Sequence, residues 1–228
     1  METIVLSLGG SIIVPDEINT DFLKKFKQFI LKYVKKGFRF IIICGGGKTC
    51  RKYQKAAKKI SNVDQYELDC LGIEITKMNA FFVKQLFGKN AYEKIITDPH
   101  EKIKTGKKII IGAGWKPGCS TDKDAVILAK KFDADLIVNM FDLDYVYTKD
   151  PKKHKDAKPI TQLSWDKMLK ITGNKWTPGL NAPFCPEAGK LAMKNQLEVV
   201  ILKGTDLNNL GRLFDGKEFN GTVITSSD

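Results

Sequence analysis

The chain has 228 residues, enough for one sizeable α/β domain, and its 43% hydrophobic content excludes a wholly disordered protein. No apolar run reaches the roughly 18–20 residues that a helix needs to cross a bilayer. With 38 Lys and Arg against 26 Asp and Glu, the net charge is +12, which favours an anionic partner without choosing between nucleotides, nucleic acid and anionic lipid.

Apolar runs alternate with segments of helical periodicity along the whole chain. In chain order we expect a strand at 3–8, a helix from Asn19 or Thr20 to Gly37, a strand at 38–44, helices at 48–60 and 68–86, strands at 94–96 and 108–112, a helix at 122–132, a strand at 135–140, a short helix after Ser164, a helix at 186–194, a strand at 198–202, a helix at 207–214 and a strand at 222–225. This alternation predicts a single α/β domain, a three-layer α/β/α sandwich with a mostly parallel central sheet.

The first long helix carries an aromatic stripe. Phe22, Phe26, Phe29, Ile30 and Tyr33 recur at helical spacing, so one face of this helix is apolar. We interpret that face as core.

The cysteines and histidines bear on compartment and metal binding. The five cysteines are odd in number and scattered, without the spacing of a zinc site or disulfide scaffold, so a reduced, cytoplasmic setting is the simplest. The first residues, Met1 to Thr3, lead straight into a strand-like run and do not resemble a signal peptide. With only His100 and His154, the sequence argues against a histidine-rich metal site, and we assign no metal ligand.

Three glycine turns follow three of the expected strands: Gly9-Gly10-Ser11, Gly45-Gly46-Gly47-Lys48 and Gly112-Ala113-Gly114. Such a turn before a helix presents free backbone N–H groups and the positive end of the helix dipole, which together bind anions such as phosphate. A single glycine turn after a strand is weak evidence, because it is often just a tight connection. Three such turns in one chain indicate two phosphate-bearing ligands. Neither the Walker spacing nor the dinucleotide-binding spacing is present, which argues against a P-loop kinase and a dehydrogenase.

Polar side chains lie next to these turns. Lys48 follows the triple glycine directly, and Arg51 lies one helical turn later, where a guanidinium can contact phosphate with two hydrogen bonds. Ser120-Thr121-Asp122 precedes the helix after the third turn. These residues either cap that helix or bind phosphate and orient cations, and position alone does not separate the two roles.

Five segments in this order resemble the amino acid kinase superfamily, and within it the archaeal type of UMP (uridylate) kinase. They are Leu6-Ser7-Leu8-Gly9-Gly10-Ser11, Gly45-Gly46-Gly47-Lys48 with Arg51-Lys52-Tyr53, Gly72-Ile73-Glu74-Ile75-Thr76 with Asn79-Ala80, Pro117-Gly118 with Ser120-Thr121-Asp122, and Asp144 with Val146-Tyr147-Thr148 and Asp150-Pro151. The likeness spreads over nearly the whole chain.

The resemblance implies ATP-dependent phosphorylation of UMP to UDP, with Mg²⁺ accompanying ATP. It implies catalytic roles for Asp122, Arg51 and Lys48. The implied ATP-binding residues are Gly9, Gly10, Ser11, Gly47, Arg51, Phe141, Asp142, Tyr147 and Asp150. The implied UMP-binding residues are Gly46, Asp69 (at the ribose), Gly72, Thr76, Trp115, Lys116, Pro117, Gly118, Cys119, Ser120 and Thr121. By the same resemblance, residues 1–135 form a UMP lobe, residues 136–228 form an ATP lobe, and the chain forms a hexamer through segment 22–33 or 78–86.

Three positions depart from the family pattern. Ser7 stands where the superfamily often has Lys, Tyr145 where a glycine is usual, and Cys185 where an Asp is expected. A thiol cannot supply a carboxylate's charge at neutral pH, so Cys185 puts the geometry of the ATP site in question. We assign no role to the segment 176–179.

Three alternatives stay open beside the UMP kinase. One is another kinase of this superfamily acting on a small phosphate, carboxylate or carbamate. A second keeps the fold as a nucleotide sensor or an anion-storage subunit without catalysis. The third, a nucleic-acid binder, rests on charge alone and lacks a recognisable module. The partners implied by the resemblance are ATP, UMP and further copies of the chain, and we expect no nucleic acid and no membrane.

Overall fold

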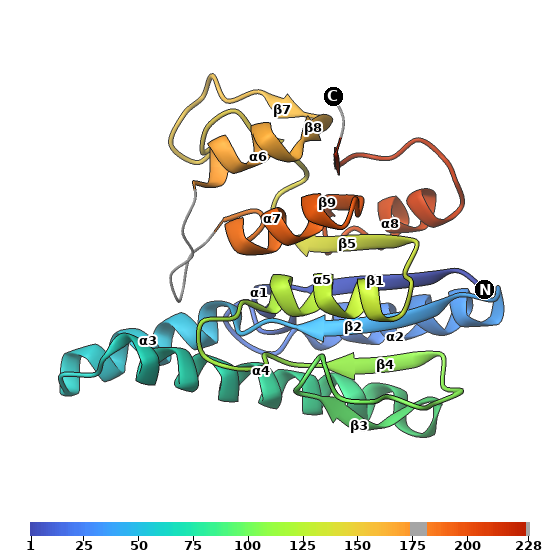
Figure 1. Cartoon of the computed structure of the whole chain (residues 1–228), viewed down its shortest axis with the longest axis horizontal. Helices are drawn as coiled ribbons and strands as arrows, with labels where there is room; N and C mark the ends of the chain where they lie inside the picture. Colours follow the sequence, from blue (N-terminus) through green and yellow to red (C-terminus); the bar gives the residue numbers. More distant parts are fainter. Residues whose placement is uncertain (174–181, 227–228) are drawn as a thin grey trace.

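Eight strands form one central sheet, with helices on both of its faces (Figure 1). The structure is a computed structural model that describes residues 1–173 and 182–226. The strands of this sheet are β1 (Thr3–Leu8), β2 (Arg39–Cys44), β3 (Ala91–Ile96), β4 (Ile109–Gly112), β5 (Leu136–Phe141), β8 (Gln162–Ser164), β9 (Val199–Lys203) and β10 (Thr222–Thr225). Their order is β3-β4-β2-β1-β5-β9-β10-β8.

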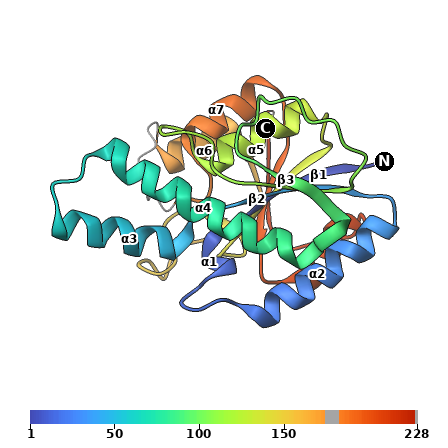
Figure 2. The same ribbon diagram turned by 90° about the horizontal axis from the view of Figure 1, so that it is seen from below.

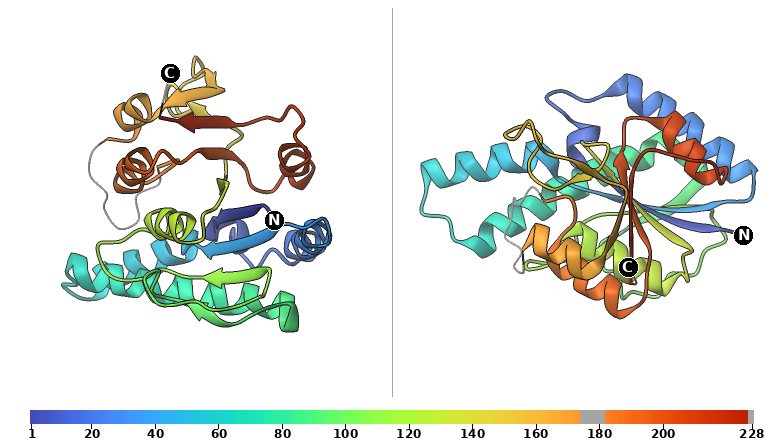
Figure 3. Two further views of the ribbon diagram at one scale, coloured as in Figure 1. Left: turned by 45° about the vertical axis from the view of Figure 1, so that its right-hand side comes forward. Right: turned by 90° about the horizontal axis from the view of Figure 1, so that it is seen from above.

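Six neighbouring strands, from β3 to β9, run parallel. Strand β10 is antiparallel to β9, and β8 is parallel to β10, so the reversed pair closes one edge. A separate two-stranded sheet joins β6 (Val146–Tyr147) to β7 (Pro159–Ile160). Seen from above in Figure 3, the strands fan out with the twist typical of such sheets. The predicted α/β/α sandwich with a mostly parallel sheet is confirmed.

The helices divide between the two faces. On one face lie α2 (Thr20–Lys35), α4 (Gln65–Phe87) and α8 (Leu207–Phe214), and on the other lie α5 (Thr121–Lys131), α6 (Trp165–Thr172) and α7 (Pro186–Lys194). The short α1 (Gly10–Ile13) follows β1, α3 (Gly47–Ile60) follows β2, and a 3-10 turn, η1 (Gly88–Asn90), precedes β3. Figure 2 shows α3 beside the first half of α4, both extending past the sheet.

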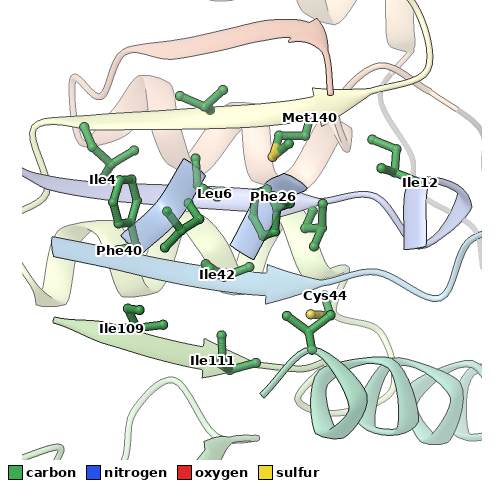
Figure 4. Close-up of a cluster of buried hydrophobic side chains, with 14 of the residues drawn as sticks. Ile4, Leu6, Ile12, Phe26, Phe40, Ile42, Cys44, Ile109, Ile111 and Met140 are labelled. Atoms are coloured by element: carbon green, nitrogen blue, oxygen red, sulfur yellow. The ribbon is translucent and has the colours of Figure 1, made fainter. Parts of the chain in front are cut away.

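The strands are buried on both faces, which explains their continuous apolar runs. In β1, Ile4 and Leu6 pack with Phe26 of α2 in the layer drawn in Figure 4, whereas Val5 points into the opposite layer. Phe26 is fully buried. Replacing such a ring by alanine costs about 3–5 kcal/mol of folding free energy.

Most predicted elements are confirmed, and their ends lie within three residues of the predicted positions. The helix expected at 68–86 begins at Gln65 because Asp64 and Glu67 form a capping box, in which each side chain accepts a hydrogen bond from the other's backbone N–H. The aromatic stripe is core, as predicted: Phe22, Phe26 and Tyr33 are buried. Helix α1 and strands β6 to β8, each of at most four residues, were not predicted. Segment 176–179 lies outside the described residues.

None of the helices in the described part of the chain is long and apolar enough to cross a membrane.

Candidate active site

A cleft of about 210 Å³ opens at the carboxyl ends of β1, β2 and β5. In parallel sheets this edge is where ligands bind, because the loops after neighbouring strands diverge there. Helices α3 and α4 and the start of α5 supply further walls. The cleft therefore gathers residues from both halves of the chain, although they are far apart in sequence.

The first two glycine turns touch backbone to backbone at this cleft. A Cβ on Gly10 would lie 2.5 Å from the carbonyl carbon of Gly46 and 2.5 Å from the amide nitrogen of Gly47. Gly47 also has φ of +60°, in the region that favours glycine. Asn79 of α4 fixes the second turn by donating from Nδ2 to the carbonyl oxygen of Gly45 at 2.8 Å. The two anion-binding turns are thus a single packed unit.

Ser11 links this unit to α3. Its Oγ accepts hydrogen bonds from Nη2 of Arg51 at 3.2 Å and from the backbone N–H of Lys48 at 3.1 Å. Arg51 is half-buried and lines the cleft, so its remaining N–H groups can meet phosphate oxygens there. The Lys48 side chain instead is exposed and lies 3.5 Å from Asp16.

Asp122 lies at the start of α5, beside the end of β1. It accepts hydrogen bonds from Oγ of Ser7 at 3.1 Å and from the backbone N–H of Cys185 at 3.0 Å. Burial raises the pKa of Asp122, and these two hydrogen bonds oppose that rise. Ser120 caps α5 by accepting from the N–H of Lys123 at 3.2 Å, and Ser120 also lines the cleft, so its two predicted roles are compatible.

The loop between β4 and α5, which we call the acceptor loop (residues 113–120), is held from two sides. From α4, Oγ1 of Thr76 accepts from the N–H of Gly114 at 2.8 Å, and Oδ2 of Asp69 accepts from the N–H of Gly118 at 2.5 Å. Burial raises the pKa of Asp69, while the Gly118 bond lowers it. From α5, Asp124 contacts the loop as well.

The structure brings most of the predicted site residues to one cleft. Those lining it are Gly9, Gly10, Ser11, Gly46, Gly47, Arg51, Asp69, Gly72, Thr76, Cys119, Ser120, Thr121, Asp122, Phe141 and Asp142. Those outside its lining are Lys48, Trp115, Lys116, Pro117, Gly118, Tyr147 and Asp150. The role of each residue in binding or catalysis stays a prediction.

The residues outside the lining have other contacts. The ring of Trp115 packs against that of His100, with centroids 4.8 Å apart, and Nζ of Lys116 lies 3.9 Å from the Trp115 centroid. Asp150 accepts from the N–H of Lys152 at 3.0 Å within an exposed turn.

Two polar residues of the cleft were not predicted. Asn139 is 6% exposed within the apolar β5 and donates from Nδ2 to the carbonyl oxygen of Pro183 at 2.7 Å. Gln54 is 8% exposed and donates to the carbonyl oxygen of Leu68 at 2.8 Å, which joins α3 to α4. An amide that interrupts an apolar strand just before its carboxyl end was the signal available for Asn139; Gln54 offers none, because only tertiary packing buries it.

The three departures from the family pattern have defined places. Ser7 donates to Asp122, as described above. Cys185 precedes α7, where burial raises the pKa of its thiol to about 12, so the side chain is neutral while its backbone N–H bonds Asp122. The hydroxyl of Tyr145 lies 3.0 Å from Oδ1 of Asn220. Cys185 thus contacts the predicted catalytic carboxylate through its backbone.

Comparison with known proteins places this architecture. The model of the amino acid kinase family matches residues 2–203. The chain is 32% identical to a uridylate kinase of Methanobrevibacter smithii, covering 97% of this chain and 99% of that one, and 32% identical to a uridylate kinase of Pyrococcus abyssi, covering 96% and 98%. The crystal structure of a uridylate kinase from Archaeoglobus fulgidus superposes with a TM-score of 0.80 at 26% identity, over 99% of this chain and 100% of the other. The chain belongs to the amino acid kinase family.

Proposed function

We propose that the protein transfers the γ-phosphoryl group of ATP to UMP, giving UDP and ADP. The observation that carries the proposal is the paired glycine unit, which presents two sets of backbone N–H groups at one cleft with Arg51 beside them. Two phosphate-bearing ligands can meet head to head at such a place. The near full-length similarity to proteins named uridylate kinase supports UMP as the acceptor.

In this proposal one half of the chain binds UMP and the other half binds the nucleoside of ATP. Residues 1–135 bind UMP through α4 and the acceptor loop, with Asp69 at the ribose. Residues 136–228 bind the nucleoside of ATP, through Phe141, Asp142, Tyr147 and Asp150. The ATP phosphates lie on the first glycine turn, because the sheet brings that turn next to β5.

Phosphoryl transfer requires that the two substrates are aligned and that the negative charge between them is stabilised. A UMP phosphate oxygen attacks the γ-phosphorus, a new O–P bond forms, and the bond to the β–γ bridging oxygen breaks, leaving ADP. The attacking oxygen is already ionised at neutral pH, so no general base is needed. The two substrates repel each other, and the backbone N–H groups and the Arg51 guanidinium offset that charge in the transition state.

Mg²⁺ is proposed to arrive with ATP. Among residues 1–173 and 182–226, no group of three or more His, Cys, Asp or Glu side chains is arranged to hold a metal ion. This suits Mg²⁺, which is typically held by one or two carboxylates together with substrate phosphates. Asp122 is the carboxylate at the cleft that would contact it, and the ion would neutralise phosphate charge.

The test is a coupled assay of ADP release with UMP, other nucleoside monophosphates and small acids as acceptors. We expect turnover with UMP, and a loss of about 100-fold or more in kcat for Arg51→Ala, since a positioned charge at the transferring group is worth several kcal/mol. If no acceptor gives ADP release although calorimetry shows binding of ATP or UMP, the proposal is overturned in favour of a nucleotide sensor. Turnover with a small acid alone would favour another kinase of the family.

We further propose that the chain works as a homo-oligomer, a hexamer by family resemblance, in a reducing cytoplasmic setting. All five cysteines are free thiols. Of the two contact segments predicted, 22–33 packs in the core, whereas α4 exposes Met78 (68%) and Phe81 (55%) on one side. Light scattering of the Met78→Glu/Phe81→Glu variant should show a smaller particle than wild type; an unchanged mass would refute this surface.

A further inference from the structure

Asp124 is a buried carboxylate of α5 that none of the predicted roles includes. It is 1% exposed, although it lies in the first turn of its helix. Oδ2 accepts from the backbone N–H of Trp115 at 3.1 Å, and Oδ1 accepts from Sγ of Cys119 at 3.1 Å. One carboxylate therefore binds the acceptor loop at two points four residues apart.

The groups around Asp124 supply no counter-ion bonded to it. The charged or titratable groups that interact with it are Cys119 in the loop and Asp122 and Lys123 on its own helix. Cys185, which directly precedes α7, interacts with Asp122 and Cys119. In the described part of the chain Asp124 forms no salt bridge, so its charge is balanced chiefly by the two loop hydrogen bonds.

The loop bends so that these bonds are possible. Gly118 adopts φ of +80°, and the N–H of Cys119 donates to the carbonyl oxygen of Lys116 at 3.0 Å, which turns the Cys119 thiol back into the protein. On the opposite side, Asp69 accepts from Gly118 at 2.5 Å. The exposed tip of the loop is thus held between a carboxylate on α4 and a carboxylate on α5.

We propose that Asp124 is a positioning residue that fixes the acceptor loop for the phosphate acceptor. This inference rests on the proposed function, because that function makes UMP the ligand of the acceptor loop. Both Cys119 and Ser120, which follow the bend directly, line the cleft, so a shift of the loop displaces the wall of the acceptor site. ATP is predicted to contact other segments, and its binding should not depend on Asp124.

Burial of this charge opposes folding, which argues against a purely structural purpose. Asp124 is 1% exposed, and removing an ionised carboxylate from water costs folding free energy unless a counter-charge pairs with it. An apolar or amide side chain at this position would avoid that cost. A carboxylate, however, presents one acceptor oxygen to each loop group, whereas asparagine keeps a single oxygen that can retain the Trp115 bond but gives up the bond from Cys119.

The experiment compares Asp124→Ala with Asp124→Asn in steady-state kinetics and in hydrogen exchange of residues 113–120. We expect Asp124→Ala to raise the KM for UMP about tenfold or more, as fits the loss of hydrogen bonds to a charged group, and to speed exchange in the loop. The KM for ATP should stay within about twofold of wild type. Asp124→Asn keeps an oxygen for Trp115 and should restore both readouts to within about threefold. Asp156→Ala, an exposed carboxylate paired with Lys149, is the control and should match wild type.

Equal rises in both KM values, with faster exchange throughout α5 and α7, would overturn the proposal, because that pattern marks general destabilisation. A wild-type rate of hydrogen exchange in residues 113–120 of Asp124→Ala would overturn the proposal too. So would an Asp124→Asn variant whose KM for UMP and loop exchange are as perturbed as those of Asp124→Ala. Hydrogen exchange needs no turnover. If wild type does not phosphorylate UMP, the proposed function fails while the contact of Asp124 with the loop is still tested.

Discussion

Replacing Gly10 by alanine tests whether the two glycine turns act as one unit. The new Cβ would point at the backbone of the second turn, 2.5 Å from an atom each of Gly46 and Gly47. Backbone atoms cannot rotate away as a flexible side chain can. The two turns must therefore separate, or the first turn must tilt.

The size of the displacement follows from these distances. Ordinary van der Waals contact begins at 3.4 Å, and the carbonyl oxygen of Gly45 lies still closer to the new Cβ than the two atoms named above, so the turns must move apart by about 1 Å. A misplacement of about 1 Å between reacting groups can lower the rate about 100-fold. Since the first turn is predicted to hold the ATP phosphates, and the second is predicted to contact UMP through Gly46 and ATP through Gly47, we expect kcat to fall by about that factor.

The assay is ADP release at saturating ATP and UMP, paired with thermal unfolding of each variant. Gly106→Ala is the matched control, because a Cβ there has nothing within 4 Å and the residue has no positive φ. We expect the control to keep wild-type activity and Tm. Gly10→Ala should lose activity while it remains folded at the assay temperature.

Wild-type activity in Gly10→Ala, with an unchanged Tm, would refute the reasoning. It would mean that the backbone contact between the turns is not needed for phosphoryl transfer. A Gly10→Ala variant that is unfolded at the assay temperature would show that the backbone contact between the turns is needed for folding. Gly10→Ser could not replace it as a test, since serine carries the same Cβ.

Three further predictions address charged side chains in the cleft or next to it. Arg51→Lys should recover only a small part of the activity lost in Arg51→Ala, because an ammonium cannot reproduce the forked contacts of a guanidinium; full recovery in the coupled assay would contradict this. Asp122→Asn should lower kcat by about 100-fold with little change in fold by circular dichroism, since it removes the charge proposed to contact Mg²⁺; an active variant would show that the carboxylate is dispensable. The pKa of Asp124 is raised to about 6 from 3.8, so the native state binds more protons than the unfolded state between those values and stability falls as pH rises through them. At pH 7.5 the free energy of unfolding of Asp124→Asn should therefore exceed that of wild type by up to about 3 kcal/mol, and its Tm should be higher. This difference in stability should shrink towards pH 4; a difference independent of pH would refute the raised pKa of Asp124.

Local sequence signals predicted the longer elements because those signals act over a few residues. The periodic aromatics of α2, the capping residue Asn19 and the apolar run of β1 each report on their own segment. The four-residue β4 was predicted from its run of isoleucines, whereas short elements such as α1 and β6 were missed since they carry neither a period nor an extended apolar run. They form through contacts with distant parts of the chain.

The candidate site divides in the same way. Glycine turns at the ends of strands are visible in the sequence, and the parallel alternation predicts that they share one edge of the sheet. Nothing in the sequence shows that the Lys48 side chain pairs with Asp16 at the surface, that Trp115 packs on His100, or that Gln54 becomes buried. Side-chain direction depends on packing between elements, which no local pattern encodes.

By itself, then, the sequence determined the alternation of strands and helices, the glycine turns, and a family resemblance carried by short segments in a fixed order. The tertiary structure alone decided that Gly10 touches Gly47, and that Asp124 reaches back to Trp115 and Cys119. These contacts join residues from different loops and helices. Their distances are set by strand order, by the crossing of helices over the sheet and by close packing, and these are properties of the whole folded chain.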